Sequence, residues 1–231
     1  MRTLIVGGGE VGGALARILQ NYYPVDVIDK RMTSATASNA GGYEIMHICF
    51  PFSPEFEAEF VRYRQQYQPR FIVIHSTVPP GTSRRLGAIH SPVIGIHPHM
   101  DESLTTFVKY LGGEMASEVA DYFRRAGIKV YLFNAPETTE TMKILDTTFY
   151  GICVEYTKEV KRVCDKFGIP FEAWTLWTQN YNDGYEALGH PEFVRPNLVP
   201  IMKKVGGHCV LPNADYIDTR FTRLLRELNN I

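Results

Sequence analysis

Short apolar runs alternate with stretches of helical spacing through the first 135 residues of the chain. The runs end at glycine, proline or charged residues, which is typical of buried parallel strands. Between two of them, apolar residues recur in steps of three or four from Val11 to Tyr22, and Glu118–Ala126 also fits a helix. Strands alternating with helices predict a parallel, doubly wound α/β sheet. The predicted strands are Thr3–Val6, Val25–Ile28, Glu44–Phe50, Phe71–Ile74, Val93–Ile96 and Lys129–Phe133.

The pattern changes after Pro136, because strand signals stop and one long helical pattern begins. Apolar residues recur every three or four positions through Glu137–Phe167, which predicts a helix of about 30 residues and roughly 45 Å. Gly168 and Pro170 are normal residues after a helix end. We therefore predict a sheet domain over residues 1–135 and a helical domain over residues 136–231.

Composition restricts the function classes. The 231 residues carry 24 basic and 25 acidic side chains, a net charge of −1, which gives no general affinity for nucleic acid. No apolar run approaches the roughly 18 residues of a membrane helix, and the N-terminus lacks the pattern of a signal peptide. Four cysteines without a C-x-x-C pair suit a reducing compartment. We expect a cytoplasmic protein that binds neither nucleic acid nor membrane.

Gly7, Gly9 and Gly12 form the pattern G-x-G-x-x-G between the first predicted strand and the first predicted helix. In that context, the first glycine permits the tight turn, the second lets the backbone approach a pyrophosphate, and the third lets helix pack on strand. The helix N-terminus, with Glu10 and Val11, presents unpaired N–H groups to the phosphates. The sequence therefore predicts a Rossmann-type dinucleotide site, against the alternative of a plain glycine-rich turn.

Asp29 ends the second predicted strand. A carboxylate there accepts hydrogen bonds from a ribose 2′-hydroxyl and repels a 2′-phosphate, so NAD is the expected cofactor. Lys30 and Arg31 weaken that preference, since basic side chains can hold a 2′-phosphate. The predicted cofactor-binding residues are Gly7, Gly9, Glu10, Val11, Gly12, Asp29, Lys30, Pro51, Ser76 and Thr77.

Three later segments carry a family resemblance. They are S-T-V-P-P-G-T from Ser76, E-T-M-K-I-L from Glu140, and G-G-H-C from Gly206. Together with the glycine turn, and in the same order, they resemble the UDP-glucose/GDP-mannose 6-dehydrogenase family of the 6-phosphogluconate dehydrogenase-like superfamily. The resemblance implies a Rossmann domain, a long central helix and a homodimer formed through residues 137–167. It also implies a C-terminal UDP-binding domain, for which the chain leaves only 22 residues after Cys209.

The resemblance also implies a reaction, the oxidation of a primary alcohol to a carboxylate in two steps with two NAD. Cys209 would attack the aldehyde to form a thiohemiacetal, and Lys143 would be the cation near the reacting oxygens. Thr77 and the Pro79–Gly81 loop would lie on the nicotinamide side. Glycines before a thiol allow close approach to a substrate, and positive charge favours the thiolate. An inert buried thiol and a solvated lysine are the alternative interpretations.

The chain departs from the family pattern at three positions. Thr147 stands where the family has asparagine, Asn213 where it has aspartate, and His99 near its supporting glutamate. Thr147 and Asn213 complete the candidate catalytic set with Lys143 and Cys209. These departures keep open a second hypothesis, a non-catalytic dinucleotide-binding relic or regulatory subunit.

His97-Pro98-His99 supports a third hypothesis. A His-Pro pair after a strand resembles prephenate dehydrogenases, which implies one hydride transfer on a small hydroxy acid with histidine as the acid or base. Asp101 and Glu102 follow and could complete a metal site with the two histidines, but we predict that the chain binds no metal. Loop histidines near a cofactor are the plainest interpretation. Under either enzymatic hypothesis the substrate is a small molecule.

Aromatic residues gather after the long helix. Trp174, Trp177 and Tyr181 have helical spacing, with Tyr185 and Phe193 beyond them. We expect them in a core or a subunit interface rather than in a ligand cage.

Overall fold

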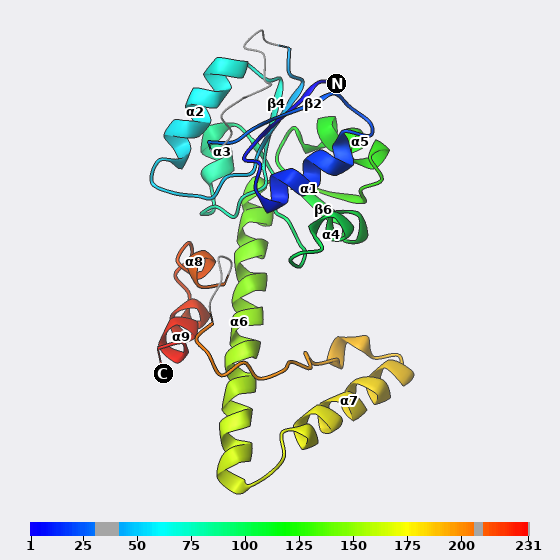
Figure 1. Ribbon diagram of the computed structural model, residues 1–231, viewed down its shortest axis with the longest axis vertical. Coiled ribbons are helices and arrows are strands. Elements are labelled where there is room, and N and C mark those ends of the chain that lie inside the picture. The colour runs from blue at the N-terminus through cyan, green and yellow to red at the C-terminus, as the bar shows by residue number, and fades with distance from the viewer. Residues whose placement is uncertain (31–41, 206–209, 231) are drawn as a thin grey trace. The chain divides into compact units, whose positions relative to one another are not determined.

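The computed structural model describes residues 1–30, 42–205 and 210–230 (Figure 1). The chain divides into two compact units, Met1–Lys143 and Ile144–Ile231. The first unit is an α/β sheet domain and the second is helical, which confirms the predicted fold class.

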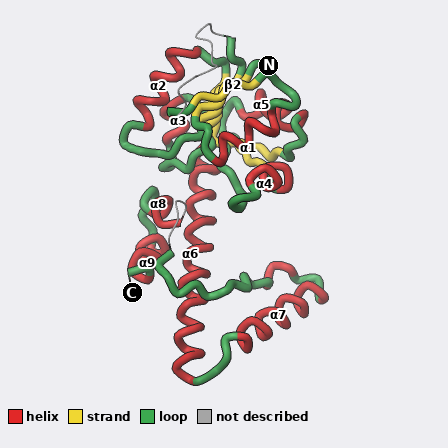
Figure 2. Tube along the Cα trace, viewed as in Figure 1, coloured by secondary structure: helices red, strands yellow, loops and turns green. Residues whose placement is uncertain are grey.

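The described strands of the first unit form one seven-stranded sheet with the order β2-β1-β3-β4-β5-β6-β7. All neighbours pair in parallel except β5 and β6, which pair antiparallel at His90 and Gly112. Figure 2 shows the strands in yellow between red helices. The strands are β1 (Thr3–Val6), β2 (Val25–Ile28), β3 (Ile45–Ile48), β4 (Phe71–Ile74), β5 (Ile89–His90), β6 (Lys109–Gly112) and β7 (Val130–Phe133).

Alternation along β1 explains the two layers of helices. Ile5 packs in one hydrophobic cluster with the helices α1, α4 and α5, while Leu4 and Val6 pack in another with α2 and α3. Because β1 is buried on both faces, it is a continuous apolar run rather than an alternating one. The helices are α1 (Glu10–Leu19), α2 (Phe56–Tyr67), α3 (Thr82–Leu86), α4 (Met100–Thr106) and α5 (Ala116–Arg125).

The predicted strand Val93–Ile96 is wrong. These residues pair with no described strand, and Ile96 is exposed. The fifth strand is instead Ile89–His90, only two residues long, and it ends just before Pro92, whose nitrogen has no proton for a ladder. The antiparallel β6 was also not predicted, because K-Y-L-G alternates too briefly to be distinguished from a loop.

The long helix is confirmed as α6 (Pro136–Phe167), which crosses the boundary between the units. The second unit continues with α7 (Glu172–Ala187), the 3₁₀ turn η1 (Pro191–Phe193), α8 (Val210–Ala214) and α9 (Arg220–Leu228). The predicted aromatic helix is thus α7, but Trp177 is exposed, so it does not belong to the core of the described unit. No described helix is long and apolar enough to cross a membrane.

Candidate functional site

The turn between β1 and α1 explains its three glycines. Gly7 has a φ of +101°, and a Cβ there would lie 2.9 Å from the carbonyl carbon of Cys49. A Cβ on Gly12 would lie 1.9 Å from the carbonyl oxygen of Gly7. At Gly9, by contrast, a Cβ would meet no described atom within 4 Å. Packing therefore requires Gly7 and Gly12, whereas Gly9 leaves open space before the N-terminus of α1, as a bound pyrophosphate needs.

Asp29 is tied to this turn, because its Oδ2 accepts a hydrogen bond of 2.8 Å from the backbone N–H of Gly8. A pocket of about 420 Å³ begins beside it. Four of the predicted cofactor-binding residues line that pocket: Gly7, Asp29, Lys30 and Pro51. Its remaining walls are Val6, Ile28, Phe50, Ser53, Glu59 and Tyr63.

The positive charge of Lys30 at the pocket is paired with a carboxylate. Its ammonium forms an ion pair with Glu59 of α2, and this hydrogen bond raises the pKa of Lys30 above its ordinary value. The sequence suggested that Lys30 weakens the preference for NAD, but in the structure the carboxylate of Glu59 neutralises the charge of Lys30. Arg31 lies outside the described residues.

The loop after β4 is held from three directions. The hydroxyl of Ser76 donates to the carbonyl oxygen of Phe50 at 2.5 Å. The Nε2 of His90 donates to the carbonyl oxygen of Ser76 at 3.2 Å, and the Nδ1 of His90 accepts from the hydroxyl of Thr139 at 2.8 Å. Thr77 follows Ser76 and is half-buried. These bonds fix the loop that the family resemblance puts on the nicotinamide side.

Glu140 provides the third anchor of this loop. It is fully buried, and its carboxylate accepts from the backbone N–H groups of Gly81 at 2.6 Å and Ser83 at 2.8 Å. Those two groups lie at the start of α3, where the helix leaves donors unpaired. The side chain of Glu140 therefore joins the proline-rich loop to the beginning of α6, one turn before Lys143 on the same helix.

The candidate catalytic residues are placed only in part. Lys143 is half-buried on α6. Thr147 is buried, and its hydroxyl donates to the carbonyl oxygen of Ile144 at 3.0 Å. Asn213 is buried in α8. Cys209 lies outside the described residues, so its predicted distance to Lys143 stays a prediction.

Gly151 explains how α8 and α9 meet α6 within the second unit. A Cβ on Gly151 would lie 2.6 Å from Cγ1 of Val210 and 2.9 Å from Cδ2 of Leu225. Val210 is the first residue of α8 and directly follows Cys209 in the chain. Thr147 lies one turn before Gly151 and so shares its face of α6.

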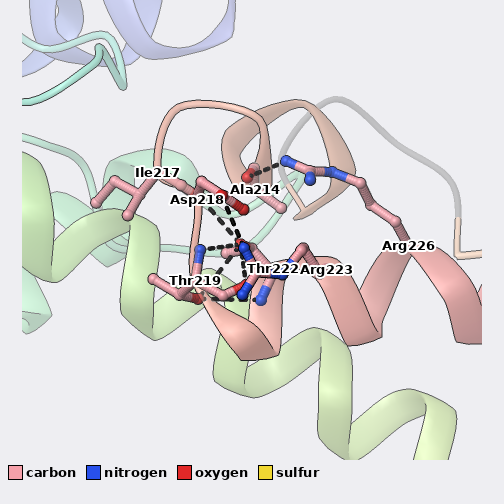
Figure 3. A network of polar contacts seen from close by, with 7 residues as sticks. All are labelled: Ala214, Ile217, Asp218, Thr219, Thr222, Arg223 and Arg226. Atoms are coloured by element: carbon pink, nitrogen blue, oxygen red, sulfur yellow. Dashed lines mark hydrogen bonds and ion pairs between the residues drawn. The ribbon is translucent and has the colours of Figure 1, made fainter.

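Polar contacts fix α9 at its beginning (Figure 3). Thr219 and Thr222 form a capping box, in which each side chain accepts from the backbone N–H of the other. Arg226 reaches back to donate to the carbonyl oxygen of Ala214 at 2.6 Å, joining α9 to the end of α8. The segment that follows Cys209 is thus anchored on α6 by packing and on α9 by hydrogen bonds.

His97 and His99 have different partners. Nδ1 of His97 contacts a carboxylate oxygen of Glu10, the first residue of α1, while Nδ1 of His99 lies 3.6 Å from a carboxylate oxygen of Glu102. Asp101 pairs with Arg17 instead. Among the described residues, no group of three His, Cys, Asp or Glu side chains is arranged to hold a metal ion.

Sequence reasoning missed a chain of hydrogen bonds inside the sheet. His47 on β3 and His75 after β4 lie buried, with 2.9 Å between Nδ1 of His47 and Nε2 of His75. Nδ1 of His75 bonds the carbonyl oxygen of Ser91 at 2.9 Å, and Nε2 of His47 lies 3.1 Å from the hydroxyl of Tyr122. Thr3 continues the chain at 2.9 Å from that hydroxyl.

Burial keeps both imidazoles neutral by lowering their pKa values, and the carbonyl of Ser91, which only accepts, then determines where each proton lies. Nδ1 of His75 must therefore donate to it, so Nε2 of His75 accepts from Nδ1–H of His47. Nε2 of His47 then accepts from the hydroxyl of Tyr122, which in turn accepts from Thr3. Both imidazoles are neutral in this arrangement.

Burial agrees with neutral groups at this place. It lowers the pKa of His47 to about 3, and it lowers that of His75 well below its usual value. Lys109 is 4% exposed, and burial lowers its pKa to about 7. Its ammonium nitrogen lies 3.4 Å from the carbonyl oxygen of Ser91. A histidine in an otherwise apolar strand, as in E-I-M-H-I-C-F, was the one available signal.

No family model matches the chain. The UDP-N-acetyl-D-mannosamine dehydrogenase of Methanococcus vannielii is 27% identical over 179 residues, which cover 69% of this chain and 38% of that protein. The enzyme of the same name from Methanocaldococcus jannaschii is 26% identical over 181 residues, covering 69% and 39%.

The resemblance to the UDP-glucose/GDP-mannose dehydrogenase family is confirmed. The match covers well under half of the curated relatives, 38% to 41% of their length. Among solved structures, the UDP-D-ManNAc dehydrogenase of Pyrococcus horikoshii aligns with a TM-score of 0.81 at 18% identity, covering 100% of this chain and 68% of that one.

A second solved structure comes from another dehydrogenase class. The 3-hydroxyisobutyrate dehydrogenase of Mycobacterium tuberculosis, solved with L-serine, aligns with a TM-score of 0.71 at 13% identity, covering 99% of this chain and 92% of that one. At such low identities, both structural likenesses establish the fold alone. The proteins that this chain resembles are thus dehydrogenases of more than one substrate class.

Proposed function

We propose that this chain is an NAD-dependent oxidoreductase that oxidises an alcohol group of a small molecule. The observation that carries the proposal is the open space at Gly9, beside a pocket in which Asp29 is fixed by the glycine turn. The turn offers backbone donors for a pyrophosphate, and Asp29 offers a carboxylate for a ribose hydroxyl. The similarity to UDP-N-acetyl-D-mannosamine dehydrogenases supports the same reaction class.

When bound, the nicotinamide cofactor would accept the hydride that leaves the alcohol carbon. The chain's own part is binding, positioning and covalent chemistry. Gly9 and the N-terminus of α1 would hold the phosphates, and Asp29 the adenosine ribose. Glu140 would position the Ser76–Gly81 loop through its two hydrogen bonds. Lys143 would stabilise negative charge on the reacting oxygen, and the thiolate of Cys209 would add to the aldehyde carbon as a thiohemiacetal.

Calorimetric titration with NAD and NADP tests the cofactor. We expect NAD to bind more tightly. Equal or tighter binding of NADP would contradict the role assigned to Asp29, and binding of neither cofactor would contradict the proposed function itself.

Limiting iodoacetamide followed by peptide mapping tests the covalent step. We expect Cys209 to react faster than Cys49, Cys153 and Cys164, because Lys143 and His208 favour its thiolate. The comparison is informative because burial raises the pKa of Cys49 to about 12 and also raises that of Cys153. If Cys209 reacts no faster than these three, the thiohemiacetal mechanism is wrong.

A second candidate function is dinucleotide binding without turnover, as in a regulatory subunit. Thr147 and Asn213 favour it, since both are buried and replace the asparagine and aspartate of the family pattern. Tight NAD binding with no hydride transfer from any nucleotide-sugar or hydroxy-acid substrate would support this alternative.

We also propose a homodimer formed through α6. The apolar stripe predicted along this helix is exposed on the second unit, at Leu145, Phe149, Tyr156, Val163 and Phe167. A stripe that follows the helix for most of its 32 residues suits a second copy of the same helix related by two-fold symmetry. Light scattering that gives a mass near 26.2 kDa would contradict the dimer.

A further inference from the structure

The charges around the pocket beside Asp29 come from two elements. Asp29 and Lys30 follow β2, while Glu59 projects from α2. The carboxyl side chain of Glu59 is only 20% exposed, whereas that of Lys30 is 67% exposed and reaches across to it. The less mobile partner of this ion pair is therefore the carboxylate, and it determines where the ammonium lies.

We propose that Glu59 determines cofactor choice by holding the Lys30 ammonium, so that the pocket accepts a nucleotide with a free 2′-hydroxyl and disfavours one with a 2′-phosphate. The inference rests on the proposed dinucleotide function. With Glu59 present, the described lining residues of the pocket carry two carboxylates and one ammonium, which is one net negative charge. A 2′-phosphate brings about two more negative charges to that place.

Without Glu59 the same pocket would suit a phosphate better. Lysine is a compact point charge on a flexible stem, so a released Lys30 can turn towards a phosphate placed near Asp29. Among the described residues, Arg62 is another cation that acts on Lys30, and its guanidinium lies 4.1 Å from the centre of the Tyr63 ring. Because Arg62 is the same in every variant below, its contribution cancels in the comparison.

Glu57 provides a matched control on the same helix. It too forms an ion pair with a basic residue, Arg85, at 2.8 Å, but it does not line the pocket. Glu59→Gln and Glu57→Gln therefore remove the same charge and release one basic side chain each. Only the first release occurs beside Asp29.

The experiment measures the ratio of the Kd for NADP to the Kd for NAD by calorimetry, with the full chain. We expect Glu59→Gln to lower the ratio about fivefold, from the loss of one carboxylate and the release of one ammonium. We expect the ratio of Glu57→Gln to stay within about twofold of the wild type. The gain of Glu59→Gln should shrink as salt rises from about 50 mM to about 500 mM, since exposed charges are screened.

A double variant separates the effect of the released ammonium from the effect of the lost carboxylate. In Lys30→Gln/Glu59→Gln the released ammonium is absent, so most of the gain should disappear. If Glu59→Gln fails to fold, Glu59→Ala carries the same expectation. A ratio that stays within twofold of the wild type in the folded Glu59 variant, while NAD still binds, would overturn the inference and leave the proposed function standing. Loss of binding for both cofactors in the wild type would instead overturn the proposed function.

Discussion

The sheet domain buries polar groups, whereas the second unit exposes apolar ones. In the first unit, His47, His75 and Lys109 lie in the interior of the sheet. In the second unit, Phe149 is 62% exposed and Tyr156 is 59% exposed on α6. Both arrangements are unusual for a single soluble domain.

The difference lies in whether each group has a partner. Every nitrogen of the two buried imidazoles has a hydrogen-bond partner, which removes most of the cost of burying them. Apolar side chains on α6 have no such local remedy, because only another apolar surface removes them from water. The first unit therefore satisfies its buried polar groups with partners of its own, whereas the exposed stripe of α6 is the surface on which the proposed homodimer rests.

Introducing negative charge into the apolar stripe of α6 should have the largest effect, which is on the oligomeric state. We expect the wild type to be a dimer of about twice 26.2 kDa, and the double variant Phe149→Glu/Tyr156→Glu to be a monomer. Two carboxylates placed in an apolar interface would each be buried without a partner. Light scattering at micromolar concentration measures the change.

Arg162→Ala is the control for that experiment. Arg162 is exposed on the same helix but away from the stripe, and it pairs with Glu159 on its own helix at 3.1 Å. We expect this variant to stay a dimer. A double variant that also stays a dimer would show that the copies meet elsewhere.

Acid should weaken the first unit through its buried histidines. An unfolded histidine has a pKa near 6.5, whereas that of folded His47 is about 3. The stabilising contribution of neutral His47 is therefore fully present above about pH 6.5 and is lost as the pH falls towards 3. At pH 4.5 the loss from this one group is about 2–3 kcal/mol.

Replacing His47 with glutamine tests this slope. Glutamine keeps a donor and an acceptor but does not titrate, so the fall in unfolding free energy from pH 7.5 to pH 4.5 should become about 2–3 kcal/mol smaller. Denaturant unfolding followed by circular dichroism measures it. His190→Gln is the surface control: it removes an exposed imidazole of the second unit that lies 2.9 Å from a carboxylate oxygen of Glu192, and it should change the slope much less. Equal slopes in all three proteins would mean that the imidazole chain does not resist protonation.

Local patterns made much of the fold predictable. The glycine turn, Asp29 and the long helix each have a signal within a few neighbouring residues, and the structure has all three. Strand β5 was placed wrongly because two residues are too short for any periodicity.

Contacts between distant segments were not predictable. His47 and His75 are 28 residues apart, Lys30 and Glu59 are 29 apart, and Gly81 and Glu140 are 59 apart. Nothing local in the sequence indicates which histidine, lysine or glutamate is paired. Only the order of strands and helices brings these side chains together. The role of Lys30 in particular depends on a residue of α2 that the pattern around Asp29 cannot indicate.

Glu140 should be the next most sensitive position. Glu140→Gln replaces one acceptor oxygen with an NH₂ group that faces a backbone N–H, so we expect a loss of about 2 kcal/mol in unfolding free energy. Hydrogen exchange at Gly81 and Ser83 should become faster. Glu137→Gln is the matched control, because Glu137 pairs with Arg84 at the exposed surface of the same two helices. We expect that variant to lose less than about 0.5 kcal/mol of unfolding free energy. An equal loss in both variants would show that Glu140 does not anchor the loop.

The smallest effect concerns the covered part of α6. At Gly151, α8 and α9 cover the helix so closely that a Cβ would lie 2.6 Å from Val210 and 2.9 Å from Leu225. Gly184 on α7 is the matched case, since a Cβ there would meet no described atom within 4 Å. Both glycines are helical, so alanine should stabilise either helix by up to about 1 kcal/mol through propensity alone.

Crowding should make the alanine substitution destabilising at Gly151 but not at Gly184. Overpacking costs about 1–3 kcal/mol, so Gly151→Ala should lower the unfolding free energy of the second unit by about 1 kcal/mol after the propensity gain. Gly184→Ala should raise it by about 0.5 kcal/mol, because the open site adds no clash. The difference between the two variants in thermal or denaturant unfolding isolates the packing of α8 and α9 on α6. If both alanines stabilise equally, the side chains of Val210 and Leu225 yield without cost, and the segment after Cys209 is held less firmly than the contacts at Gly151 indicate.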